Sequence, residues 1–116
     1  MGRKNVVKSY KMIDAGDLSG NITSSTTNVI NLDKASVHLN WSGTSPVGVI
    51  TVEARNGEGD SWYELDMGST MNISGNSGNH QLLFLELPVT DIRIVYTFSS
   101  GVGTLDATFT SKVVGA

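Results

Sequence analysis

Apolar and polar residues alternate along several stretches of the chain. In SVHLNW (residues 36–41), the apolar letters V, L and W take every second position and the polar letters S, H and N take the others. The same period of two recurs in residues 50–55, 92–98 and 105–110. Successive side chains of a strand point to opposite faces, so the pattern is typical of a strand with one face in a core and the other in solvent.

Eight stretches carry this pattern or are rich in β-branched and aromatic residues, and clusters of Gly, Ser, Asn and Pro separate them. In chain order they are NVVKSYKMI, TTNVINLDKASVHLNWSG, VGVITVEAR, SWYELDM, STMNIS, QLLFLEL, DIRIVYTFSS and GTLDATFTSKVV. The segments SGTSP, SSGVG and GNSGNH are expected to be turns or loops. Only MIDAGDLSG has helix-like punctuation, and Gly16 and Gly20 interrupt it within two turns. We therefore predict one all-β domain over residues 1–116, an antiparallel, jelly-roll-like β-sandwich of about eight strands.

The composition excludes several classes of function. A net charge of −3 at pH 7 argues against binding to nucleic acid, which needs clustered Lys and Arg. The absence of cysteine excludes disulfides, thiolate zinc sites and thiol nucleophiles. No apolar run approaches the roughly 20 residues that span a membrane, and the start of the chain lacks the apolar core of a secretory signal. We therefore expect a protein that is made in the cytosol and binds neither nucleic acid nor membrane.

Basic residues gather in one segment near the start of the chain, GRKNVVKSYK. Its charged residues are Arg3, Lys4, Lys8 and Lys11. A solvated terminal strand is the more common origin of such a cluster, and contact with an acidic partner is the alternative. Residues 1–12 are accordingly expected to form an edge strand or an N-terminal arm, and the four basic residues are candidates for partner binding.

The loop RNGEGD (residues 55–60) separates two predicted strands. Asn56-Gly57 is the strongest short hairpin signal, because both central positions of a type I′ turn take a positive φ. The alternative is a calcium site. The acidic residues available as its ligands are Glu58, Asp60, Glu64 and Asp66. Their spacing does not match an EF-hand, so we expect a hairpin bend and no bound metal.

A carbohydrate site stacks sugar rings on exposed aromatic side chains, and this chain has several aromatic residues that bear on that possibility. Trp41 shares its face with Val37 and Leu39, so we expect it in the core. Trp62 and Tyr63 are adjacent and face opposite ways, so one of them should be exposed. A sugar-stacking site on Trp62 or Tyr63, with Arg55 as hydrogen-bond donor, is the alternative binding hypothesis.

The sequence contains no recognisable set of catalytic residues. His38 and His80 are the only histidines, and neither has a second ligand at zinc spacing. The serine-containing turns lack the strand-elbow-helix context of a nucleophile, and no carboxylate pair suggests a glycosidase. We predict a non-enzymatic protein without cofactor.

Two segments, INLDKASVHLNWSGTSPVGVITVEARNGEGDSWYEL and DIRIVYTFSSGVGTLDATFTSK, resemble a small β-sandwich family of virion proteins from tailed bacteriophages. The match covers about two thirds of the chain, and its motifs are mostly turn and core residues. The matching positions are Leu32-Asp33, Gly43 to Gly48, Asn56-Gly57, Trp62 to Leu65, Ile92 to Thr97 and Gly101 to Leu105.

The resemblance implies a structural protein of the phage particle, made in the host bacterial cytoplasm and located in the virion. Most specifically it implies a capsid decoration or cement protein that binds the outer face of the shell and stabilises it. A carbohydrate-binding or receptor-binding module of a tail or fibre is the alternative. The partners expected on this basis are the major capsid protein or other virion subunits, together with further copies of the chain in a dimer or trimer.

Overall fold

The computed structural model describes residues 5–29, 34–65, 71–84 and 89–114. This part of the chain consists of strands and turns and contains no helix that could cross a membrane. The strands are β1 (Asn5–Asp17), β2 (Ile22–Thr23), β3 (Thr27–Asn28), β4 (Lys34–Arg55), β5 (Tyr63–Glu64), β6 (Met71–Ile73), β7 (Ser77–Phe84) and β8 (Asp91–Val114). All pairings between them are antiparallel.

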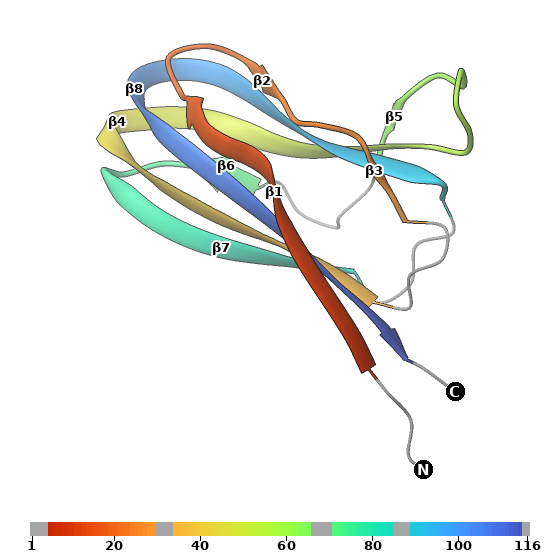
Figure 1. The fold of residues 1–116 in the computed structure, drawn as a ribbon. Coiled ribbons are helices and arrows are strands. Elements are labelled where there is room, and N and C mark those ends of the chain that lie inside the picture. Colours follow the sequence, from red (N-terminus) through yellow and green to blue (C-terminus); the bar gives the residue numbers. More distant parts are fainter. Residues whose placement is uncertain (1–4, 30–33, 66–70, 85–88, 115–116) are drawn as a thin grey trace.

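The fold is built on β4 and β8, which pair along almost their whole lengths. Their register runs from Lys34 opposite Lys112 to Arg55 opposite Asp91, and it shifts between Thr44 and Val47 and again between Val47 and Gly48. At these shifts the two-stranded ribbon bends and returns over itself (Figure 1). One continuous sheet therefore supplies both layers of a sandwich, and the predicted all-β, antiparallel β-sandwich is confirmed.

The shorter strands extend each half of the ribbon. In the first layer, β1 pairs with the C-terminal half of β8, and β7 pairs with the N-terminal half of β4. In the second layer, β2 and β3 pair with the N-terminal half of β8, and β5 and β6 pair with the C-terminal half of β4. Each layer thus has the long ribbon at its centre and short strands at its margins.

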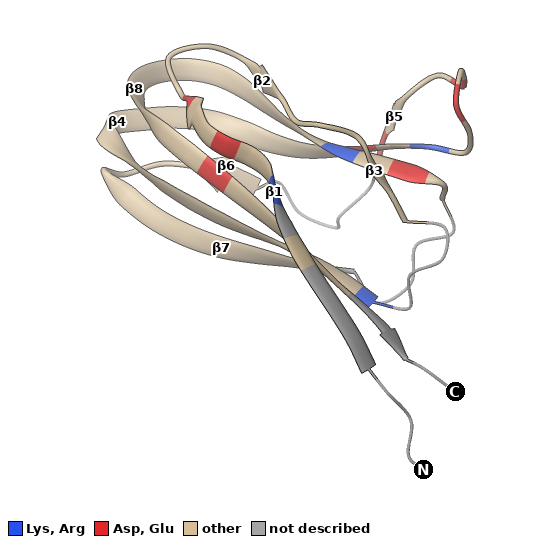
Figure 2. Ribbon diagram, viewed as in Figure 1, with Lys and Arg blue, Asp and Glu red and all other residues tan. Residues whose placement is uncertain are grey.

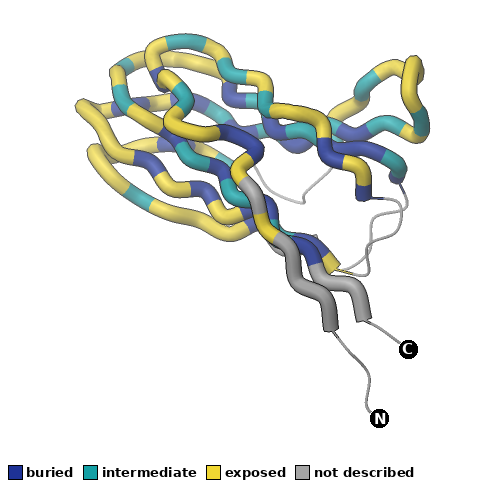
Figure 3. The backbone as a smooth tube through the Cα atoms, viewed as in Figure 1, coloured by how far each residue is buried: buried dark blue, intermediate teal, exposed yellow. Residues whose placement is uncertain are grey.

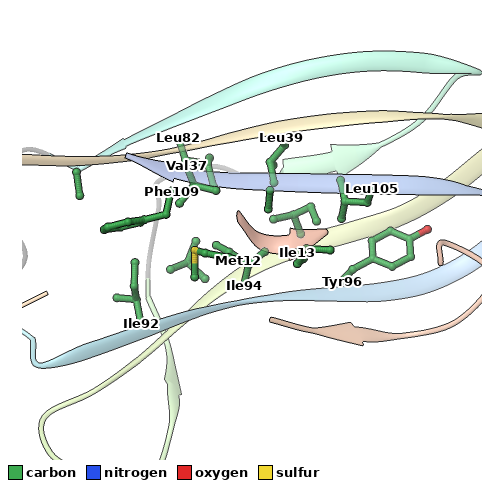
Figure 4. Close-up of a cluster of buried hydrophobic side chains, with 14 of the residues drawn as sticks. Met12, Ile13, Val37, Leu39, Leu82, Ile92, Ile94, Tyr96, Leu105 and Phe109 are labelled. Carbon is green, nitrogen blue, oxygen red and sulfur yellow. The ribbon is translucent and has the colours of Figure 1, made fainter. Parts of the chain in front are cut away.

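The core lies between the two layers, and Figure 4 shows side chains from both meeting there. Its buried apolar residues are 7% exposed or less. They are Met12, Ile13, Leu18, Val29, Ala35, Val37, Leu39, Trp41, Ile50, Val52, Ala54, Ile73, Leu82, Val89, Ile92, Ile94, Tyr96, Leu105, Ala107 and Phe109. Buried and exposed positions alternate along the long strands (Figure 3), so the faces predicted from the period of two, including the burial of Trp41, are confirmed.

The bend requires residues without a side chain. A Cβ on Gly48 would overlap the ring of Tyr96, and a Cβ on Gly101 would overlap the carbonyl oxygen of Ser45. Gly101 also has a φ of 84°, a conformation that residues with a side chain rarely adopt. The hydroxyl of Tyr96 donates to the backbone carbonyl of Val47 (3.0 Å), which fixes the ring beneath the bend.

Several predicted boundaries were wrong. SGTSP and SSGVG do not end strands, because β4 and β8 continue through them with a local shift of register. GNSGNH was expected to be a loop, but its residues from Ser77 onward begin β7. The loop after β4 is longer than a two-residue turn: the N–H of Asp60 donates to the carbonyl of Gly57 (3.0 Å), and the positive φ falls on Gly59.

Candidate functional site

Two cross-strand ion pairs lie on the outer face of the second layer. Arg55 on β4 is opposite Asp91 on β8, and Glu53 is opposite Arg93. The Nε atom of Arg55 is 2.8 Å from Oδ2 of Asp91, and Nη2 of Arg93 is 2.7 Å from Oε1 of Glu53. Both pairs are largely shielded from solvent, which strengthens their attraction relative to a pair on an open surface.

The side chain of Trp62 covers these ion pairs. Its ring centroid lies 4.2 Å from the guanidinium carbon of Arg93 and 4.7 Å from that of Arg55. At such distances a cation over the ring is attracted by its quadrupole. Trp62 therefore attaches the loop that follows β4 to the face of the sheet. Figure 2 shows the basic and acidic segments side by side where β4 and β8 pair near β3.

This arrangement bears on the sugar-stacking hypothesis. The structure brings Trp62 and Arg55 together, as the hypothesis requires, but the Arg55 Nε donates to Asp91 and two guanidinium groups already lie over the Trp62 ring. Tyr63 is 42% exposed and lies opposite Ala54, a core-facing residue, so it is not on the Trp62 face. The two aromatic residues do not form one platform, and binding of a sugar by either stays a prediction.

The basic residues of the N-terminal segment are only partly placed. Arg3 and Lys4 lie outside the described residues, and Lys8 belongs to β1 with an undescribed side chain. The Nζ of Lys11 lies 3.3 Å from Asp106 and 3.4 Å from Asp14. These hydrogen bonds and charges, Asp106 first, raise the pKa of Lys11. The charge of Lys11 is thus compensated within the chain, and partner binding by the cluster stays a prediction.

Asp106 also organises a bulge in β1 that the sequence did not reveal. The register of β1 against β8 shifts between Ile13 and Gly16, and Ala15 there has a φ of 51°. The Ala15 N–H donates to Oδ1 of Asp106 (2.8 Å). This bond is the main cause that lowers the pKa of Asp106, with a further contribution from Lys11. No local sequence signal joins residues so far apart in the chain.

Three partly exposed apolar residues lie in or beside the bend of the ribbon. They are Val47, Phe98 and Val102, which are 41%, 37% and 52% exposed, and together we call them the bend patch. Phe98 continues the alternation of Ile94 and Tyr96, so the period of two places it on the same face as these two buried residues. It lies opposite Gly48 beside the bend, where the core ends, and its ring is therefore partly exposed.

Within the described ranges, no three Asp, Glu or His side chains gather in a group that could hold a metal ion. Glu58, Asp60 and Glu64 are exposed on the hairpin before and within β5. Asp66 lies outside the described residues. The described part of the loop therefore offers single carboxylates rather than a shared coordination site.

No protein-family model matches the chain, and no curated protein matches its sequence. Solved structures share its fold. The SPBc2 prophage-derived protein YomS aligns with a TM-score of 0.60 and 13% identity, over 95% of this chain and 96% of that one. The infectious bursal disease virus Gt strain aligns with a TM-score of 0.58 and 15% identity, over 95% of this chain and 32% of that one.

A variant VP2 protein of infectious bursal disease virus, in derived T=1 particles, aligns with a TM-score of 0.52 and 14% identity, over 95% of this chain and 32% of that one. The chain thus spans about a third of the length of the matching infectious bursal disease virus chains and nearly all of YomS. The common feature is the fold. At these identities the similarity concerns the arrangement of strands alone.

Proposed function

We propose that this chain is a non-enzymatic structural protein of a bacteriophage virion, and specifically a capsid decoration or cement protein that binds the outer face of the shell and stabilises it. The observation that carries the proposal is the alignment over almost the whole length of both this chain and a prophage-derived protein. The fold shared with a VP2 protein in T=1 particles adds support. Its partners are the major capsid protein and further copies of the chain, and its location is the virion.

The surface of the chain fits a role in assembly. A protein that acts by binding to a lattice needs a contact surface rather than a cleft, and apolar side chains at such a surface supply affinity. Within the described residues, the bend patch supplies exposed apolar side chains for this contact. It lies at one end of the fold, where β4 and β8 both pass through the bend (Figure 1).

The copy number of the chain in purified particles of the source phage tests the proposal. Quantitative mass spectrometry against the major capsid protein is expected to give a ratio near one or a simple fraction of one. Shells that lack the chain are expected to unfold at a higher temperature after the purified chain is added back. Absence of the chain from the particle would contradict the virion role, and an unchanged shell would contradict the cement role.

The alternative is a carbohydrate-binding or receptor-binding module of a tail or fibre. The exposure of Tyr63 favours it, because a free aromatic ring is a stacking surface. It predicts only a few copies per particle, together with binding to host cell-surface glycans that Tyr63→Ala abolishes. Replacement of Trp62 is a poor test of that idea, because its ring already covers Arg55 and Arg93.

A further inference from the structure

Strand β7 forms an outer edge of the first layer. It pairs with β4 in an unbroken register, from Ala35 opposite Phe84 to Ser42 opposite Ser77. Among the residues that the structure describes, none pairs with its other side, and Figure 1 shows it at the margin of the sheet. The free N–H and C=O groups along such an edge are a template for another strand.

The backbone of β7 presents every second residue to that free side. The N–H of Gly43 on β4 donates to the carbonyl of Asn76 (2.8 Å), so the carbonyl of residue 76, directly before β7, points toward β4. In an antiparallel ladder this direction alternates from one residue to the next. The even-numbered residues of β7 therefore bond to β4, and the odd-numbered residues direct their N–H and C=O groups away from the sheet. The outward-directed residues are Ser77, Asn79, Gln81 and Leu83.

The opposite edge of the same layer differs from β7. Strand β1 is interrupted by register shifts between Lys11 and Gly16, and irregularities and lysines of this kind prevent unwanted pairing. β7 has no bulge, and its sequence SGNHQLLF contains no Lys, Arg, Asp, Glu or Pro. The absence of these protective features from β7 points to a partner strand.

We propose that β7 of a second copy of this chain pairs antiparallel with β7 across a two-fold axis, so that the two first layers join into one sheet. This inference goes beyond the proposed virion role and does not depend on it. Two-fold symmetry lets an edge serve as its own partner, and an edge without charged residues brings no like charges together. A ring of three would need β7 to pair with a different edge, and the other edge of this layer is the interrupted β1.

The backbone directions select one register for this dimer. Outward-directed residues meet each other when Asn79 lies opposite Gln81 and Ser77 lies opposite Leu83, and this register uses all of them. His80 then lies opposite its counterpart on the two-fold axis. That pair is not hydrogen-bonded through the backbone, so its side chains approach closely.

Analytical ultracentrifugation of the purified full chain tests the proposal, and a dimer is the expected result. His80→Lys places two positive charges opposite each other and is expected to yield a monomer. His38→Lys is the matched control, because it makes the same change at an exposed position on the adjacent strand β4, and it is expected to remain a dimer. A wild-type monomer at the highest soluble concentration, a dimeric His80→Lys variant or a monomeric His38→Lys variant would each overturn the proposal.

Amide hydrogen exchange locates the interface independently. In the proposed dimer the amides of Asn79 and Gln81 are as protected as that of His80, whereas in a monomer these two exchange rapidly. Gln81→Pro removes an N–H that does not bond to β4, so the circular dichroism spectrum is expected to stay that of the wild type while the dimer is lost. Rapid exchange at Asn79 and Gln81 in the wild type would overturn the proposal even if a dimer formed through another surface.

Discussion

Replacement of Gly48 by alanine tests how closely the bend packs against the core. A Cβ at this position would overlap the ring of Tyr96. That ring is fully buried, and its hydroxyl donates to the carbonyl of Val47, so the ring cannot move aside without breaking the hydrogen bond. Overpacking of a dense core costs about 1–3 kcal/mol, and loss of a hydrogen bond adds about 1 kcal/mol. We expect Gly48→Ala to lower the free energy of unfolding by about 2–4 kcal/mol.

Urea unfolding followed by far-ultraviolet circular dichroism measures this change. Gly20→Ala is the matched control, since nothing lies within 4 Å of a Cβ there, and its effect is expected to stay within about 1 kcal/mol. Tyr96→Leu removes the ring atoms that the new methyl group meets, so its combination with Gly48→Ala should cost less than the sum of the two single changes. Equal losses for the two alanine variants, or additive losses in the double variant, would refute the proposed steric conflict.

Three further variants probe the contacts described above. Asp106→Asn should destabilise the fold at neutral pH. The folded-state pKa of Asp106 is lowered, so its ionised carboxylate stabilises the folded state above the unfolded pKa of about 3.9. The difference in stability from wild type should therefore shrink as pH falls through the folded-state pKa. A pH-independent difference in urea unfolding would contradict this. Trp62→Ala should cost about 1–2 kcal/mol through loss of both cation–π contacts, and an unchanged thermal midpoint would show that the ring contributes nothing to stability. Gly101→Ala should lower the thermal midpoint by at least roughly 4 °C, because its positive φ makes the change cost more than about 1 kcal/mol, and a wild-type midpoint would contradict that strain.

The alternation of apolar residues predicted the core because each layer buries one face. Val37 and Leu39 on β4, and Ile94 and Leu105 on β8, are all fully buried, as a period of two requires when solvent contacts the other face. Phe98 follows the same period, yet it is 37% exposed. The alternation of apolar and polar residues predicts which face of the strand a residue occupies. It does not predict where along the strand the core ends.

The sequence did not predict that β4 and β8 are each one long strand with a bend in the middle. Gly43 and Pro46 resemble the end of one strand and the start of another, yet the pairing with β8 resumes after a short shift. Glycine and proline mark both turns and bulges, so local composition does not separate a hairpin from a bent ladder. The contacts of Trp62 with Arg93 and of Asp106 with Ala15 join distant parts of the chain, and only the folded structure brings them together.

The low identity to YomS has a physical explanation. A sandwich of this kind needs alternating apolar residues and a few small residues at the bend, and many sequences satisfy those conditions. At 13% identity the two proteins share a fold, and both roles proposed for this chain depend on its surface. The bend patch and the β7 edge consist of different residues, so mutation can separate their proposed roles. Val102→Asp should weaken binding to the shell and leave the dimer intact, whereas His80→Lys should dissociate the dimer and leave the bend patch unchanged. If both variants lost both properties, shell binding would require the dimer, and the two surfaces would act as one.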